Sequence, residues 1–250
     1  MMNFVYAAYG QEHVEMAVKS AQTAMRWHPE AVCTIYTDTS YPEIIMGAPI
    51  YNPVYPDLFQ HPWMLTNTLC QVNFLLSLGE NEAVTIFLDN DVIVRQPMPE
   101  LPGADMCVTW RDNVGELSEQ QPYNYGVLIV NHTIPAIRAM LWLEHRIMQL
   151  HPRRQKWYGN QIALRELVGP LRKDETVTRE MGTFAVDVHQ LPCHKFNWSP
   201  PTERLYQNAG DKVFVHLKGE RKEAFNHYYQ LVMNHENPQA KNSISQTEAS

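Results

Sequence analysis

The sequence has few cysteines. Its 250 residues include only Cys33, Cys70, Cys107 and Cys193, and no two of them form a Cys-x-x-Cys pair. Zinc sites and thiol redox motifs usually bring paired cysteines together at that spacing. We therefore expect four buried thiols in a reducing compartment rather than disulfides or a zinc site.

Long apolar runs are also missing. No segment reaches the ~18 consecutive apolar residues that a membrane-spanning helix needs. The N-terminus lacks the basic leader, apolar core and small-residue cleavage site of a signal peptide, so we expect no export. The sequence thus predicts a cytoplasmic protein without a transmembrane segment.

Positive charge does not dominate the chain. Its formal net charge is −7, which argues against bulk nucleic-acid binding, since phosphate backbones attract clustered Lys and Arg. A local basic patch is still present. Its members are Arg153, Arg154, Lys156, Arg165, Arg172 and Lys173. A solvated helical face is the favoured interpretation, and a surface for an anionic partner or acidic acceptor is the alternative.

Glycine-rich phosphate loops are absent as well. The chain contains neither Gly-x-Gly-x-x-Gly nor Gly-x-x-x-x-Gly-Lys-Ser/Thr. A bound phosphate must then be held by a metal and by donors from separate segments.

Apolar patterns typical of strands alternate with helical spacing along the chain. The first three elements form a β-α-β unit, which implies parallel strands joined by a right-handed crossover. We predict an α/β fold with a mixed, mostly parallel sheet in one domain, residues 1–236, followed by a polar tail, 237–250, that we expect to be disordered. Predicted strands cover 4–9, 32–37, 84–88, 105–110, 126–130, 184–188 and 213–215, and predicted helices cover 14–25, 64–78, 135–148, 160–167 and 224–233.

Thr133 is a candidate cap for the helix at 135–148, which Pro135 would begin. Between 42 and 56, four prolines predict short extended pieces.

Two carboxylates follow the most apolar strand. The segment 84–88 reads Val-Thr-Ile-Phe-Leu and is followed by Asp89, Asn90 and Asp91. Such a run is typical of a strand buried on both faces, and open α/β sheets place their sites where strands end. Two carboxylates around one residue can converge on a hard divalent cation. Ordinary turn chemistry is the alternative, because Asp and Asn favour turns.

A second polar group follows the strand at 213–215. His216 is a candidate metal ligand, and Lys222 can pair with a diphosphate as a point charge. Between them, Gly219 can adopt a turn conformation or let a ligand approach the backbone. Taken alone, this segment is better interpreted as a histidine at a strand end followed by solvated charges.

The order and spacing of the motifs resemble retaining glycosyltransferase family 8, the group that includes glycogenin and bacterial lipopolysaccharide galactosyltransferases. The resemblance covers residues 4 to about 230. The segments that carry it are Phe87-Leu88-Asp89-Asn90-Asp91-Val92, Tyr123-Asn124-Tyr125-Gly126, Gly159-Asn160-Gln161, Leu191-Pro192, Phe196-Asn197 and His216-x-x-Gly219-x-x-Lys222.

This resemblance implies a GT-A fold and a metal-dependent glycosyltransferase that uses Mn²⁺ or Mg²⁺. The metal ligands would be Asp89, Asp91 and His216. Asn160 and Gln161 would lie at the reaction centre. The residues implied for the donor, a UDP-sugar, are Tyr9, Asp38, Asn90, Tyr123, Asn124, Gly126, Gly219 and Lys222. The sugar would pass to an acceptor hydroxyl with retention of configuration, and the acceptor stays open among a glycan, a lipid, a protein and a modified base.

Several positions depart from the family pattern. Ala8-Tyr9 replaces the common Ala-Asp, Asn160 replaces a common Asp, and the helix at 64–78 carries no Arg or Lys. The family's frequent Pro-Trp after the lysine is Glu223-Ala224 here. These departures keep a second hypothesis open, a catalytically silent protein that binds a sugar nucleotide or a glycan.

Overall fold

The structure is a computed structural model and describes residues 1–45, 49–78, 83–111, 122–170 and 172–234. The predicted tail, 237–250, therefore lies outside the described residues, as does the predicted domain boundary at 236. None of the described helices combines the length and the apolar character needed to span a membrane.

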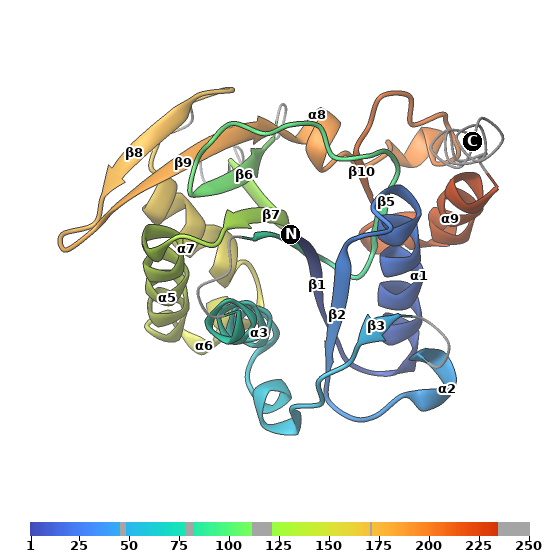
Figure 1. The fold of residues 1–250 in the computed structure, drawn as a ribbon, viewed down its shortest axis with the longest axis horizontal. Helices are drawn as coiled ribbons and strands as arrows, with labels where there is room; N and C mark the ends of the chain where they lie inside the picture. Colours follow the sequence, from blue (N-terminus) through green and yellow to red (C-terminus); the bar gives the residue numbers. More distant parts are fainter. Residues whose placement is uncertain (46–48, 79–82, 112–121, 171, 235–250) are drawn as a thin grey trace, which may run out of the picture.

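An α/β architecture is present, as predicted (Figure 1). Within the described residues the main sheet has eight strands in the order β3-β2-β1-β4-β7-β6-β9-β8. The strands from β3 to β4 run parallel, β7 is antiparallel to both of its neighbours, and β9 is parallel to β6. The strands are β1 (Met2–Ala8), β2 (Val32–Thr37), β3 (Ile50–Tyr51), β4 (Val84–Leu88), β6 (Met106–Trp110), β7 (Tyr123–Asn131), β8 (Thr176–Glu180) and β9 (Ala185–Pro192).

Helices cover both faces of this sheet (Figure 1). One face packs against α3 (Trp63–Ser77), α5 (Ile134–Met148) and α7 (Gly159–Val168), and the other packs against α1 (Gln11–Trp27). Strand β4 shows why its sequence is apolar throughout. Phe87 meets Phe74 of α3, with ring centroids 6.4 Å apart, whereas Ile86 and Leu88 join the core on the α1 side.

A second, two-stranded sheet pairs β5 (Val92–Val94) with β10 (Phe214–His216) in antiparallel register. Its residues are buried, and it packs beside α1 and α9 (Phe225–Met233). The prediction included the strand at 213–215 but neither its partner β5 nor the edge strand β8. Strand β5 has only three residues, and β8, Thr-Val-Thr-Arg-Glu, contains a single apolar residue, so neither leaves an apolar pattern to detect.

The proline-rich segment is only partly extended. Besides β3 it forms α2 (Pro42–Ile45) and a 3₁₀ helix, η1 (Pro56–Gln60), because proline fits the first turn of a helix. The prediction of short extended pieces alone was therefore wrong here. The remaining short elements are α6 (Pro152–Lys156), α8 (Cys193–Phe196), η2 (Thr202–Arg204) and η3 (Gly219–Ala224).

All four cysteines are buried and none forms a disulfide. Burial raises the pKa of Cys33, Cys70 and Cys107 to about 12, so these thiols stay protonated near neutral pH. The expectation of buried thiols is confirmed, and the expectation that the protein occupies a reducing compartment stays a prediction.

Candidate active site

Three strand ends bring the predicted metal ligands together. Strand β4 ends before Asp89, whose backbone N–H donates to the carbonyl oxygen of Gly126 at 3.0 Å. Strand β5 begins just after Asp91. Because β5 and β10 pair with His216 opposite Val92, the imidazole lies beside the carboxylates. The N–H of Leu217 donates to the backbone oxygen of Asp91 at 2.9 Å and holds the two segments together.

The three side chains form a compact cluster. Nε2 of His216 lies 3.1 Å from Oδ1 of Asp91 and 3.5 Å from Oδ2 of Asp89. One ligand atom from each residue lies within 4.8 Å of the other two. The side chains of Asp91 and His216 are 9% and 3% exposed, whereas that of Asp89 is 34% exposed. The cluster is therefore closed toward the core and open on the side of Asp89.

An amide network orients the imidazole of His216. Nδ1 lies 2.8 Å from Oδ1 of Asn197, and the amide nitrogen of Asn197 donates to Oγ1 of Thr109 at 2.9 Å. Thr109 in turn donates to the backbone oxygen of Asn124 at 2.8 Å. The Asn197 oxygen can only accept, so Nδ1 carries the hydrogen, and Nε2 is the nitrogen that faces the carboxylates, where it can take a cation or a proton.

Glycine is the only residue type that fits at position 126, beside this cluster. A Cβ atom at Gly126 would lie 2.2 Å from Cε1 of His216 and 2.9 Å from Oδ2 of Asp89. The imidazole of His216 is buried and held by Asn197, so it cannot retreat from such a Cβ without breaking this hydrogen bond. The glycine lets strand β7 approach both predicted ligands.

The donor set suits a divalent cation. Oδ1 of Asp91 is buried and has no hydrogen-bond partner among the described residues, and without a proton on Nε2 the imidazole of His216, 3.1 Å away, is a second acceptor facing it. Two acceptors facing each other in a buried site need a proton or a cation between them. Two carboxylate oxygens and an imidazole nitrogen form a mixed set of the kind that Mn²⁺ accepts.

The two carboxylates differ electrostatically. Burial raises the pKa of Asp89, and repulsion from Asp91 adds to it against the attraction of His216. Burial alone would also raise the pKa of Asp91. The positive charge of His216 in its protonated form, together with that of Lys222, outweighs burial there and holds the pKa at about 2. Asp91 is thus the permanent anion of the pair.

Cationic groups surround this cluster. Nζ of Lys222 lies 3.7 Å from Oδ2 of Asp91. Burial lowers the pKa of His13, and the charge of Lys222 lowers it further, which places His13 of α1 near that lysine. Gly219, between the cluster and Lys222, has a φ of +62° with no atom close to where a Cβ would lie. The backbone there is in the conformation that glycine favours, next to open space.

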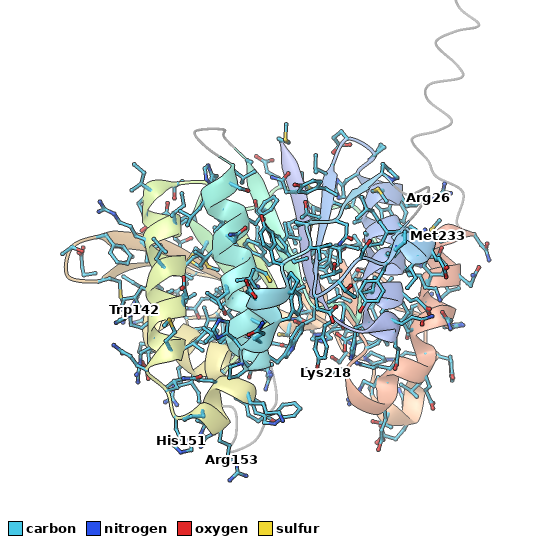
Figure 2. All side chains as sticks on the ribbon, turned by 90° about the horizontal axis from the view of Figure 1, so that it is seen from below. Arg26, Trp142, His151, Arg153, Lys218 and Met233 are labelled. Atoms are coloured by element: carbon cyan, nitrogen blue, oxygen red, sulfur yellow. The ribbon has the colours of Figure 1, made fainter. Side chains whose placement is uncertain are left out.

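The predicted reaction-centre amides are linked to the cluster through two cations. Oε1 of Gln161 accepts a hydrogen bond from Nη2 of Arg111 at 3.2 Å. Burial lowers the pKa of Lys218, and the charge of Arg111 lowers it further, while both carboxylates of the cluster raise it. Lys218 therefore lies among Arg111, Asp89 and Asp91, and Figure 2 shows it at the lower edge between the two halves of the molecule.

Asn160 is buried at the start of α7. Its side-chain oxygen accepts from the N–H of Gln161 at 2.8 Å, so this side chain holds the helix start. Asn160 and Gln161 thus lie together, and within the described part of the chain the side chain that contacts a cation is that of Gln161.

Tyr9 lies in an aromatic pocket of about 400 Å³. Its ring is 5.0 Å from that of Trp63 and 5.7 Å from that of His13, and it is 46% exposed. Asp38 is tied to the same region, because its Oδ1 accepts from the hydroxyl of Tyr41, which accepts from the N–H of Gly10. The structure therefore brings Tyr9 and Asp38 to one edge of the sheet.

The remaining predicted donor residues are distributed unevenly. Asn90 is buried between the two carboxylates, and Asn124 belongs to the network behind His216. Tyr123 is fully buried, and its hydroxyl lies 3.2 Å from the oxygen atoms of Gly169 and Gln190. The structure places the side chain of Tyr123 in the core, away from the metal cluster.

Sequence reasoning missed His13, Arg111 and Lys218 as members of this site. Each is a single polar residue beside an apolar strand or helix, which is weak evidence on its own. Lys218 carried the best signal, because it lies between His216 and Gly219 in a motif already selected.

No protein-family model matches the sequence, and no curated protein matches it. Solved structures do. Galactosyltransferase LgtC, in complex with donor and acceptor sugar analogs, is 14% identical with a TM-score of 0.58, and the match covers 92% of this chain and 96% of that one. The chain has the GT-A glycosyltransferase fold.

Two further structures share this GT-A fold. A glycosyltransferase involved in glycosylation of the major capsid of PBCV-1 is 14% identical with a TM-score of 0.57, covering 91% of this chain and 98% of that chain. The glycosyltransferase GlyE of Streptococcus pneumoniae TIGR4 is 10% identical with a TM-score of 0.52, and the match covers 93% of this chain and 62% of that chain. The predicted fold is confirmed by these matches, which extend over nearly the whole chain.

Proposed function

We propose that the protein is a metal-dependent glycosyltransferase that moves a sugar from a nucleoside diphosphate, UDP-sugar being the favoured donor, to an acceptor hydroxyl with retention of configuration. The observation that carries this proposal is the orphaned Oδ1 of Asp91, which lies 3.1 Å from Nε2 of His216 and beside Asp89 on a GT-A fold. Such a group is incomplete without a cation.

Asp89, Asp91 and His216 would hold Mn²⁺ or Mg²⁺. When bound, the metal supplies positive charge that stabilises the leaving diphosphate. The open side of Asp89 leaves room for phosphate oxygens. Lys222 and the backbone at Gly219 lie next to this opening and would position the diphosphate.

Gln161 would act at the sugar. Its amide is neutral and a poor nucleophile, so it would orient the donor sugar or support the positive charge that develops at the anomeric carbon. Arg111 fixes the amide by donating to Oε1. Tyr9 would stack on the base, since an aromatic face in its pocket is exposed.

A panel of nucleotide sugars tests the proposal. We expect at least one UDP-sugar to raise the melting temperature with Mn²⁺ present and to release diphosphate, because ligands that bind only the folded state stabilise it. Asp91→Ala should abolish the release while the fold survives, and excess EDTA should have the same effect. Full turnover in EDTA, or wild-type turnover by Asp91→Ala with Mn²⁺ present, would contradict the metal assignment.

A silent sugar-nucleotide or glycan binding protein is the second candidate. It is favoured by Asn160, whose oxygen is engaged with the N–H of Gln161 and which supplies no carboxylate. Metal-dependent donor binding with no donor hydrolysis and no transfer to any acceptor would support this candidate over the enzyme.

A further inference from the structure

A cationic and aromatic pocket lies beside the candidate active site. We call it the α6 surface and define it by His151, Arg153, Arg154, Trp157 and Tyr158, which line a pocket of about 720 Å³. All five residues are exposed, Trp157 to 58% and Tyr158 to 48%. Figure 2 shows His151 and Arg153 extending from the same edge of the molecule as Lys218.

The positive charge of the α6 surface is not balanced locally. Among the residues that the structure describes, no carboxylate lines the pocket and no ion pair involves Arg153 or Arg154. In contrast, Arg146 on the neighbouring helix α5 pairs with Glu166 through two nitrogens. Unpaired guanidinium groups next to exposed aromatic rings are available to a ligand.

The other side of α6 faces the proposed donor pocket. Pro152 and Lys156 line the aromatic pocket that contains Tyr9. Helix α6 therefore separates the predicted base-binding side chain from the α6 surface. A molecule bound on the α6 surface lies next to the donor and does not occupy its place.

The α6 surface is also fixed rigidly to the reaction-centre amides. Tyr158 adopts a positive φ of 66° and immediately precedes α7, whose first turn carries Asn160 and Gln161. Gly159 is packed so tightly that a Cβ atom there would lie 2.6 Å from the backbone oxygen of Arg154. A ligand on the α6 surface is thus held at a set position relative to Gln161.

The chemistry of these side chains defines the ligand. Two neighbouring guanidinium groups offer planar forks that match phosphate or carboxylate oxygens. An exposed indole offers an apolar face against which a sugar ring can pack. We propose that the α6 surface binds the acceptor, and that the acceptor is a saccharide bearing phosphate or carboxylate groups. This inference rests on the proposed transferase function.

A nucleic acid fits these observations less well. The chain carries a net charge of −7, and the two arginines of the α6 surface lie on one short helix. Of the other members of the basic patch, Lys156 lies on the opposite side of α6, and Arg165, Arg172 and Lys173 lie outside this helix, with Lys173 over the ring of Trp110. A strand that must contact many successive phosphates would find few cations along its path.

Binding to immobilised oligosaccharides tests the inference with the full chain, Mn²⁺ and UDP present. Matched glycans that carry a phosphate, a carboxylate or no charge show which of the two anionic groups the surface binds. A single-stranded oligonucleotide shows whether nucleic acid binds instead. We compare wild type with Arg153→Gln/Arg154→Gln and with Trp157→Ala. The control is Arg138→Gln/Arg204→Gln, which removes two exposed arginines from α5 and η2.

We expect wild type and the control to prefer at least one anionic glycan class over the neutral one, and both test variants to lose about tenfold or more in affinity for it. Equal affinity for neutral and anionic glycans, tighter binding of the oligonucleotide, or wild-type affinity in Arg153→Gln/Arg154→Gln would overturn the inference. Melting temperatures of the variants report separately on folding. Donor binding by wild type is measured in parallel, and its absence counts against the proposed function instead.

Discussion

At the scale of single residues, the candidate metal site depends on side chains that never touch a metal. Asn197 fixes which nitrogen of His216 faces the carboxylates, and Gly126 leaves the space that His216 and Asp89 fill. Partners of this kind orient metal ligands and tune their basicity. The site is therefore larger than its three proposed ligands.

Gly126→Ala provides the sharpest test of this arrangement. The added methyl group overlaps His216 and Asp89, so we expect Mn²⁺ affinity to fall by about 10-fold to 100-fold and donor turnover to fall with it. Isothermal titration with Mn²⁺ measures the affinity. Gly103→Ala is the matched control, because no atom lies within 4 Å of its added Cβ. Equal Mn²⁺ affinity in the two variants would refute the role of Gly126.

At the scale of elements, helix α5 shows how a predicted boundary is built. The hydroxyl of Thr133 accepts from the N–H of Ala136 at 3.2 Å and donates to Oδ1 of Asp105 at 2.6 Å. The other oxygen of Asp105 accepts from the N–H of Asp187 at 2.9 Å. One cap residue thus joins α5 to the beginning of β6 and to β9.

Thr133→Ala should therefore lower the free energy of unfolding by more than the removal of a solvent-exposed cap residue does. We expect the free energy of unfolding to fall by about 1–2 kcal/mol. Urea denaturation followed by circular dichroism measures it. Thr133→Ser keeps the hydroxyl and should lose clearly less. If Thr133→Ser and Thr133→Ala are equally unstable, the missing methyl group and not the cap explains the loss.

The elements also show what the sequence could and could not predict. The apolar run at 84–88 and the helical spacing at 14–25 predicted β4 and α1, because burial on one or both faces leaves a periodic pattern. Strand β5 has three residues, and its partner β10 lies far along the chain. Pairing between such segments leaves no local pattern. The link from Gln161 through Arg111 to Lys218 is likewise a product of tertiary packing.

At the scale of the whole molecule, stability should depend on pH through buried histidines. Nε2 of His28 accepts from the backbone N–H of Met98 at 3.0 Å, and burial lowers the pKa of His28, with Glu30 opposing this. Burial also lowers the pKa of His189. The folded state thus disfavours the charged imidazole, and stability is lost as the pH falls below the unfolded value of about 6.5.

We therefore expect the melting temperature to decrease between about pH 7 and about pH 5.5, above the range in which ordinary carboxylates titrate. His28→Gln keeps an acceptor for Met98 but cannot take up a proton in this range. Its melting temperature should vary less with pH than that of wild type, as scanning calorimetry in matched buffers would show. An equally steep profile in His28→Gln would assign the pH dependence to other groups.

The location of His216 on β10 has a consequence for biosynthesis. Asp89 and Asp91 leave the ribosome long before His216 does, and β5 has no pairing partner until β10 follows. Domains generally fold as units while the chain emerges at about 5–20 residues per second. A translation product that stops before residue 216 would carry the acidic pair without its imidazole. The proposed three-ligand site can therefore be assembled only after the ribosome has passed β10.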